Sequence, residues 1–259
     1  MGATNQDAKS ASAATFGNEP AALPLYAQVK KHLIHRVLNG EWQPGKRLPS
    51  EAEIAQGYGL SLGTVRKAIK EMVDEGLVAR WPGRGTFVTS HGPGGHRPFR
   101  FNCVHRDDGE RMAGQPTRYL DARADQADVR AAGGLHIGVG ESVSVIVRLR
   151  QLQDQPVLIE TSYLSQALCP EAHARLWKDQ PDSVYQLLEQ AYGILVTRVE
   201  EKVRARAATE DESTQLHLTE RTPVLEIERT AFSLSDERVE WRTIVCDTAH
   251  FHYLNQQKR

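Results

Sequence analysis

The stretch from Leu48 to Val88 constrains the fold more than any other part of this 259-residue chain. It carries the capping residues of two short helices, a glycine between them, and a Gly/Pro-rich turn flanked by strand-forming residues. In this order the signals predict two helices joined by a tight turn and followed by a β-hairpin. That series of elements is typical of a winged helix-turn-helix, whose second helix enters a DNA groove.

The two predicted helices have recognisable ends. Ser50 is a suitable N-cap for the first helix, carboxylates follow it where the helix dipole favours them, and Gly59 permits the turn. Ser61 caps the second helix, whose apolar residues recur at spacings of three and four. Gly76 ends that helix, and the strands around a turn at 82–85 form the wing. The second helix is therefore the candidate recognition helix.

Candidate DNA contacts lie on this recognition helix, at the helix starts and on the wing. Arg66 is the strongest, because its planar guanidinium can make paired hydrogen bonds to a guanine edge or a phosphate. Its alternative role is an ion pair with Glu71 or Asp74. Helix N-termini bind phosphate oxygens, and a wing glycine lets the backbone approach a minor groove. The predicted DNA-binding residues are Ser50, Ser61, Gly63, Thr64, Arg66, Lys67, Arg84 and Gly85.

Residues upstream complete a basic N-terminal domain. Residues 1–22 contain few bulky apolar side chains, which predicts a disordered tail. Residues 25–38 have apolar side chains at helical spacing and predict a packing helix, with Trp42 filling the core beyond it. Residues 23–90, here called the head, hold ten Lys or Arg against six Asp or Glu, a net charge of +4. The rest of the chain carries −5, so the head is the part suited to phosphate.

The pattern changes after a Gly- and Pro-rich linker at 91–98. Residues 99–259, here called the body, mix alternating strands with short helices, which predicts an antiparallel α+β domain. The expected strands span 116–124, 142–152, 157–164, 194–206, 224–234, 239–245 and 251–254. The expected helices span 126–132, ended by Gly133-Gly134, and 171–177, 183–192 and 209–218. His91 and His96 in the linker lack a third ligand, so no metal ion and no cofactor is predicted.

The head resembles the GntR family of bacterial transcription regulators. The correspondence begins at Pro24-Leu25-Tyr26 and continues through Leu-Pro-Ser-Glu at 48–51 and Thr-Val-Arg at 64–66 to Gly-Arg-Gly-Thr-Phe-Val at 83–88. The body is similar to the UTRA effector domain of the HutC-like branch, which has the chorismate lyase fold. Its matching stretches are 148–150, 156–164, 183–188 and 239–242. The resemblance implies a winged helix-turn-helix followed by an antiparallel effector-binding and dimerisation domain.

The candidate effector site lies on the strand at 142–152. Arg148 and Arg150 are two residues apart, so both side chains leave one face, opposite the valines. Two cations on one face favour binding of a carboxylate, phosphate or sulfonate ligand. The alternative is that the two arginines lie on a solvated face of the sheet and pair with carboxylates of neighbouring strands. A three-residue turn at 154–156 would set Glu160 across from Arg150, whereas a two-residue turn would send it to the other face. The UTRA resemblance implies effector-binding residues Arg148, Arg150, Glu160, Tyr163 and Glu240.

Three positions depart from the family pattern. Ala52 and Leu62 stand where many relatives have arginines, which implies an operator unlike the usual half-site or weaker binding. Cys246 stands where relatives often have a tyrosine near the effector, which implies an altered ligand.

Together these features predict a ligand-responsive regulator, most often a repressor, that binds an inverted-repeat operator as a homodimer. Two alternatives remain, an enzyme of chorismate lyase-like fold and an architectural DNA binder without a ligand. The enzyme is disfavoured because the candidate site has no legible nucleophile and base. Three widely spaced cysteines, no apolar stretch of membrane-spanning length and no signal peptide predict a cytoplasmic protein that is not associated with a membrane. The resemblance to the GntR family implies in addition that the protein is bacterial and associated with the nucleoid.

Overall fold

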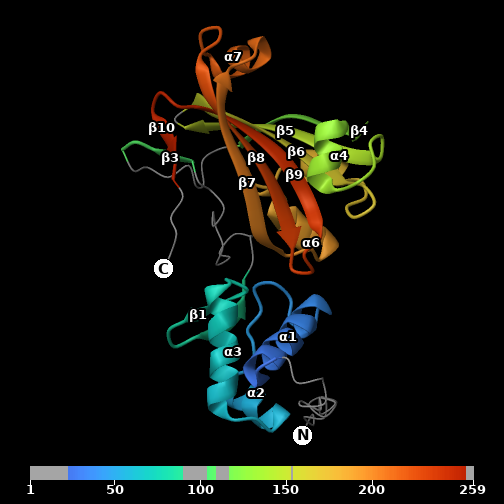
Figure 1. Cartoon of the computed structure of the whole chain (residues 1–259), viewed down its shortest axis with the longest axis vertical. Coiled ribbons are helices and arrows are strands. Elements are labelled where there is room, and N and C mark those ends of the chain that lie inside the picture. The colour runs from blue at the N-terminus through green and yellow to red at the C-terminus, as the bar shows by residue number, and fades with distance from the viewer. Residues whose placement is uncertain (1–22, 90–103, 109–116, 153, 255–259) are drawn as a thin grey trace, which may run out of the picture. The chain divides into compact units, whose positions relative to one another are not determined.

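The computed structural model of the chain describes residues 23–89, 104–108, 117–152 and 154–254. The chain divides into two compact units, Met1–Ser90 and His91–Arg259 (Figure 1). The predicted tail at 1–22 and linker at 91–98, including His91 and His96, lie outside the described residues.

Three helices and a hairpin form the head, as the sequence predicts. They are α1 (Leu25–Leu38), α2 (Glu51–Tyr58), α3 (Leu62–Asp74), β1 (Val78–Trp81) and β2 (Gly85–Val88). The Ser50 hydroxyl accepts the N–H of Glu53, whose carboxylate accepts the N–H of Ser50, so α2 begins in a full capping box. The Ser61 hydroxyl accepts the N–H of Thr64 and caps α3 in the same way.

One apolar core holds these head elements together. The apolar stripe of α3 packs on α1, and Trp42, 7% exposed, joins the core as predicted. The fully or almost fully buried side chains are Val29, Leu33, Leu48, Val65, Ala68, Ile69, Met72, Val78 and Val88. The remaining faces of α3 are left to polar and basic side chains.

The body is built on a six-stranded sheet in the order β4-β5-β6-β9-β8-β7 (Figure 1). All its neighbouring strands are antiparallel, which confirms the predicted α+β class. The strands are β4 (Thr117–Gln126), β5 (Ser142–Leu152), β6 (Gln155–Ser165), β7 (Val196–Ala207), β8 (Pro223–Ser233) and β9 (Arg238–Asp247). A separate pair, β3 (Val104–Arg106) with β10 (Phe251–Tyr253), lies outside this sheet.

Helices cover both faces of the sheet. They are α4 (Val129–Leu135), α5 (Ala172–Asp179), α6 (Val184–Tyr192) and α7 (Glu210–Leu216). On one face α5 and α6 share a core with Ile146 and Leu164, and β3 and β10 pack farther along the same face against Ile244. On the other face α4 packs against Val145, and α7 packs against Leu149. The first of these faces also carries the buried charged residues Arg148, Glu160 and Arg242.

The predicted end of the helix near residue 132 was wrong. Helix α4 begins at its N-cap Asp128, runs through both glycines and ends at His136 in the left-handed conformation. A Cβ placed on Gly134 would lie 2.2 Å from the Trp241 ring. Gly134 therefore serves close packing of the helix on the sheet and does not end it.

The turn between β5 and β6 is the two-residue alternative and not the three-residue turn at 154–156. Leu152 pairs with Gln155, so the connection is two residues long, and this alone would have turned Glu160 to the other face. The register then shifts between Gln151, which pairs with Pro156, and Arg150, which pairs with Leu158. This bulge adds one residue to β6, so the side chains that follow it change to the opposite face of the sheet once more. As a result Glu160 pairs directly with Arg148.

Candidate DNA interface and anion site

The outward face of α3 presents the basic side chains expected of a recognition helix. Arg66 and Lys67 are exposed, and 61% of the Arg66 side chain is accessible. Arg66 donates from Nε to a Glu51 carboxylate oxygen at 3.1 Å, and not to Glu71 or Asp74 as the alternative role supposed. Those two carboxylates pair with Lys30 and Lys70.

The first turn of α3 is a hydroxyl-lined helix N-terminus. Ser61 Oγ lies 2.8 Å from Thr64 Oγ1, and Gly63 between them is exposed. Such a terminus combines unpaired backbone N–H groups with the positive end of the helix dipole, which suits a phosphate. Ala52 and Leu62, which stand where many relatives have arginines, are both exposed, so neither position supplies a cation to this surface.

Aromatic side chains position the two remaining predicted cations of the head. Lys67 places its ammonium 3.6 Å from the centre of the Tyr26 ring, and Arg84 lies 4.7 Å from the Trp81 ring at the wing. Gly85 follows with φ of +110°, and a Cβ there would lie 2.7 Å from Arg47 Nε. The positive φ therefore favours glycine here for the backbone conformation of the wing itself, independently of any contact with DNA.

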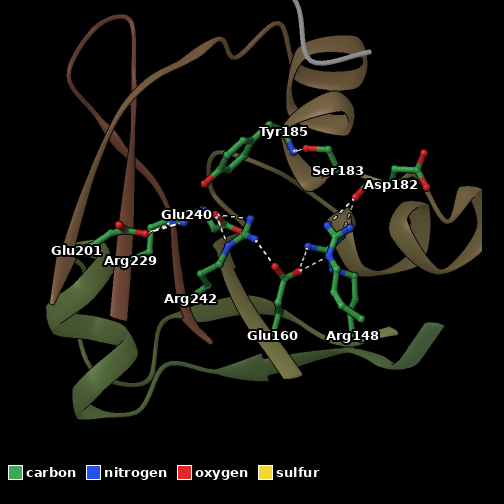
Figure 2. A network of polar contacts seen from close by, with 10 residues as sticks. Arg148, Glu160, Asp182, Ser183, Tyr185, Glu201, Arg229, Glu240 and Arg242 are labelled. Carbon is green, nitrogen blue, oxygen red and sulfur yellow. Dashed lines mark hydrogen bonds and ion pairs between the residues drawn. The ribbon is translucent and has the colours of Figure 1, made fainter. Parts of the chain in front are cut away.

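In the body, Glu160 is the centre of a buried group of arginines (Figure 2). Its carboxylate accepts from Arg148 Nη2 at 2.6 Å and from Arg242 Nη1 at 3.3 Å, and Arg150 Nε lies 3.7 Å away. Burial by itself would raise the pKa of the Glu160 carboxyl, but Arg148, Arg150 and Arg242 together lower it. Glu160 is therefore ionised across the physiological range.

Further ion pairs extend this group across the sheet, as Figure 2 shows. The Arg242 guanidinium faces both oxygens of Glu240, with N–O distances of 2.7 to 3.0 Å. Next to it, Arg229 donates to Glu201 at 2.7 Å. The Tyr185 ring from α6 lies 5.1 Å from the Arg242 guanidinium, and burial, with Glu240 nearby, raises the pKa of its phenol to about 12.

Arg148 and Arg150 reach one further acceptor, the loop before α6. The Asp182 carbonyl oxygen accepts from Arg150 Nη2 at 3.0 Å and from Arg148 Nη1 at 3.5 Å. Arg148 is fully buried, and its Nε has no partner among the described residues. Burial lowers the pKa of the Arg150 guanidinium, whose side chain is 14% exposed. These two arginines are thus less completely paired than Arg242.

We call these residues the charged cluster. It comprises four arginines, Arg148, Arg150, Arg229 and Arg242, and three carboxylates, Glu160, Glu201 and Glu240. Counted with their ordinary charges, four guanidiniums and three carboxylates leave the cluster with one positive charge in excess. A buried excess charge is costly unless a counter-ion is present.

The structure brings four of the five predicted effector residues together, and leaves Tyr163 apart. Tyr163 pairs with Trp241 across β6 and β9, and their ring centres are 5.1 Å apart under α4, on the opposite face of the sheet. Arg229, Arg242 and Tyr185 were missed. The spacing of Arg242, two residues after Glu240 on one strand, was the available signal.

Two properties can be stated for the described residues alone. No three His, Cys, Asp or Glu side chains gather there in a way that could hold a metal ion. No helix of these ranges has the length and apolarity that a bilayer crossing requires.

A winged helix-turn-helix with an exposed basic recognition helix, joined in one chain to a sheet domain, defines a DNA-binding transcription regulator. Comparison with known families agrees. The family described as "Bacterial regulatory proteins, gntR family" matches residues 25–88, and the UTRA domain matches residues 115–252. The chain therefore belongs to the GntR family and carries a UTRA domain.

Similar proteins are regulators rather than enzymes. The transcriptional repressor NagR of Bacillus subtilis is 32% identical over 83% of this chain and 87% of its own length. The histidine utilization repressor of Pseudomonas putida is 31% identical over 86% of this chain and 88% of its own. The crystal structure of a ligand-binding domain from Bordetella bronchiseptica, attributed to a GntR-family regulator, superposes with a TM-score of 0.57 and 26% identity. It covers 62% of this chain and 99% of its own.

Proposed function

We propose that this protein is a repressor that binds an inverted-repeat operator as a homodimer and changes its DNA affinity when a small anionic metabolite binds the body. The relatives are repressors, which supports the direction of control. A symmetric operator requires two heads at a fixed spacing, which a twofold dimer supplies. The place of action would be the bacterial cytoplasm, at the nucleoid.

The observation that carries the ligand proposal is the excess positive charge of the charged cluster. Arg148 and Arg150 are its least completely paired members and lie beside the loop that precedes α6. A carboxylate, phosphate or sulfonate would satisfy them through charge-assisted hydrogen bonds. Arg150 is the better ligand contact of the two, because part of its side chain is accessible whereas Arg148 is fully buried.

Ligand and DNA must influence each other reciprocally. If an anion bound to the body changes the operator affinity by some factor, the operator changes the anion affinity by the same factor. The operator itself should differ from the usual family half-site, since Ala52 and Leu62 offer no guanidinium.

The experiment has two stages on the full chain. A duplex operator is first recovered from a randomised library with the wild-type protein. Small carboxylates, phosphates and sulfonates are then screened for a rise in Tm and for a change in operator affinity. Wild-type protein should respond to at least one anion in both assays, and Arg150→Gln should respond in neither while it still binds the operator.

Arg204→Gln is the matched control, because it also removes one arginine from the body but at an exposed ion pair with Glu228. It should respond as the wild type does. An equal response from Arg150→Gln would refute the assignment of the anion to this face. A protein that no anion stabilises would instead be the ligand-independent architectural binder.

A further inference from the structure

Glu51 joins the two DNA-facing elements of the head. One carboxylate oxygen accepts from Arg66 Nε on the recognition helix α3 at 3.1 Å, and the other forms a short ion pair with Arg80 on strand β1 of the wing. Glu51 is the first residue of α2, and the capping box of Ser50 and Glu53 holds the start of that helix. A single carboxylate is therefore fixed between two arginines from different elements.

The three side chains differ in exposure. Arg66 is 61% exposed and Arg80 46%, whereas Glu51 is only 24% exposed. The Glu51 side chain is therefore less accessible to solvent than the Arg66 and Arg80 side chains that it contacts. Exposed ion pairs add little to stability, so a structural role alone gives no strong reason for this arrangement.

The orientation of Arg66 bears directly on base reading. Arg66 contacts Glu51 through Nε, and its terminal Nη1 and Nη2 have no partner in the part of the chain that the structure describes. A guanidinium reads guanine by donating two parallel hydrogen bonds to O6 and N7. Arg66 can therefore keep its side-on bond to Glu51 while its end-on pair meets a base.

We propose that Glu51 is a positioning residue for sequence discrimination. It aims Arg66 at the base edges and, by partly neutralising Arg66 and Arg80, weakens contacts that any phosphate backbone would offer. Sequence-independent affinity comes mainly from phosphate neutralisation, so a carboxylate at this place lowers it for every duplex. At the operator this loss of phosphate affinity is offset, because a guanidinium that is already oriented loses less conformational entropy when it binds the base.

The test compares the selected operator duplex with a random duplex of equal length, using fluorescence anisotropy on the full chain at several salt concentrations. Glu51→Gln should bind the random duplex more tightly and with a steeper salt dependence. Its operator-to-random affinity ratio should fall by about tenfold, the discrimination that one well-oriented bidentate contact supplies. Glu71→Gln is the matched control, since it removes the same charge from α3 at the Lys30 pair, and it should keep the ratio.

A double-mutant cycle separates positioning from net charge. In an Arg66→Ala background, Glu51→Gln should leave the ratio unchanged, because Glu51 acts through Arg66. The proposal would be overturned if Glu51→Gln left the operator-to-random affinity ratio of the wild type unchanged. It would also be overturned if Glu51→Gln changed this ratio equally in the wild type and in the Arg66→Ala background. Should Glu51→Gln fail to fold, Arg66→Lys replaces it. A lysine keeps the charge but lacks the two donor edges, and retained discrimination would also overturn the proposal.

This inference rests on the proposed role of Arg66, and the two fail differently. If Arg66→Ala binds the operator as tightly as the wild type, the role of Arg66 is wrong and the inference falls with it. If Arg66→Ala weakens operator binding and Glu51→Gln leaves the ratio intact, only the inference on Glu51 is wrong.

Discussion

The candidate DNA interface of the head and the charged cluster of the body both use arginine–carboxylate pairs, but these pairs lie in opposite environments. In the head, the Arg66 side chain is 61% exposed and that of Arg80 46%. In the body, Arg148 is fully buried and Arg242 is 5% exposed. The same chemical pair therefore meets water in one domain and a low-dielectric interior in the other.

Environment changes what such a pair can do. An exposed pair is screened by solvent and leaves its arginine accessible, so that guanidinium can also meet a phosphate or a base. A buried pair holds its members firmly, and the loss of one partner leaves an uncompensated charge. We therefore expect the pairs at the DNA interface to govern binding and the pairs of the charged cluster to govern folding and ligand selection.

The largest expected effect is on the body. Glu240→Ala should reduce the free energy of unfolding by about 3–5 kcal/mol, because the buried Arg242 would lose its bidentate partner and keep only Glu160. Urea denaturation of the full chain, followed through the body transition, measures this. Glu200→Ala, which breaks an exposed pair with Arg198, is the control and should cost less than about 1 kcal/mol. Equal losses for the two variants would break the comparison.

An intermediate effect should appear in the pH dependence of stability. The folded-state pKa of Glu160 is depressed, so its ionised form stabilises the fold fully above the unfolded pKa of about 4.3. This contribution is lost as pH falls through that value toward the folded pKa. The difference in stability between wild type and Glu160→Gln should therefore narrow from about pH 5 to pH 3, as denaturation at each pH would show. A constant difference would mean that Glu160 is not ionised in the folded protein.

The smallest expected effect is in the head. Lys70→Ala removes a pair with Asp74 whose side chains are 70% and 58% exposed. Its unfolding free energy should stay within about 0.5 kcal/mol of the wild type, with still less difference at high salt. A loss comparable to that of Glu240→Ala would show that exposure does not separate the two kinds of pair.

Strand parity shows how much of the anion site could be predicted. The spacing of Arg148 and Arg150 was enough to place them on one face, and it also relates Arg242 to Glu240. Tyr163 follows Glu160 by three residues, an odd separation, so its side chain lies on the other face of the sheet from the charged cluster. The resemblance to known relatives suggested Tyr163 as an effector contact, although the alternation of side chains along a strand predicts that it faces away from Glu160.

Other features could not have been predicted from spacing. The bulge between Gln151 and Arg150 in the β5–β6 pairing does not follow from residue spacing, although it alone keeps Glu160 facing Arg148. The passage of α4 through two glycines depends on Trp241, which is more than 100 residues away in sequence. Glu51 likewise meets Arg80 only because the wing folds back toward α2.

Local sequence signals specify the helices and wing of the head, because caps, glycine turns and helical periodicity act over a few neighbouring residues. Alternation along each strand likewise indicates the antiparallel class of the body. Which charges meet is settled by the packing of segments that lie far apart in the chain. Ion pairs such as Glu160 with Arg242 and Glu51 with Arg66 depend on register and packing between distant segments, and burial then sets whether each pair stabilises the fold or remains available for binding.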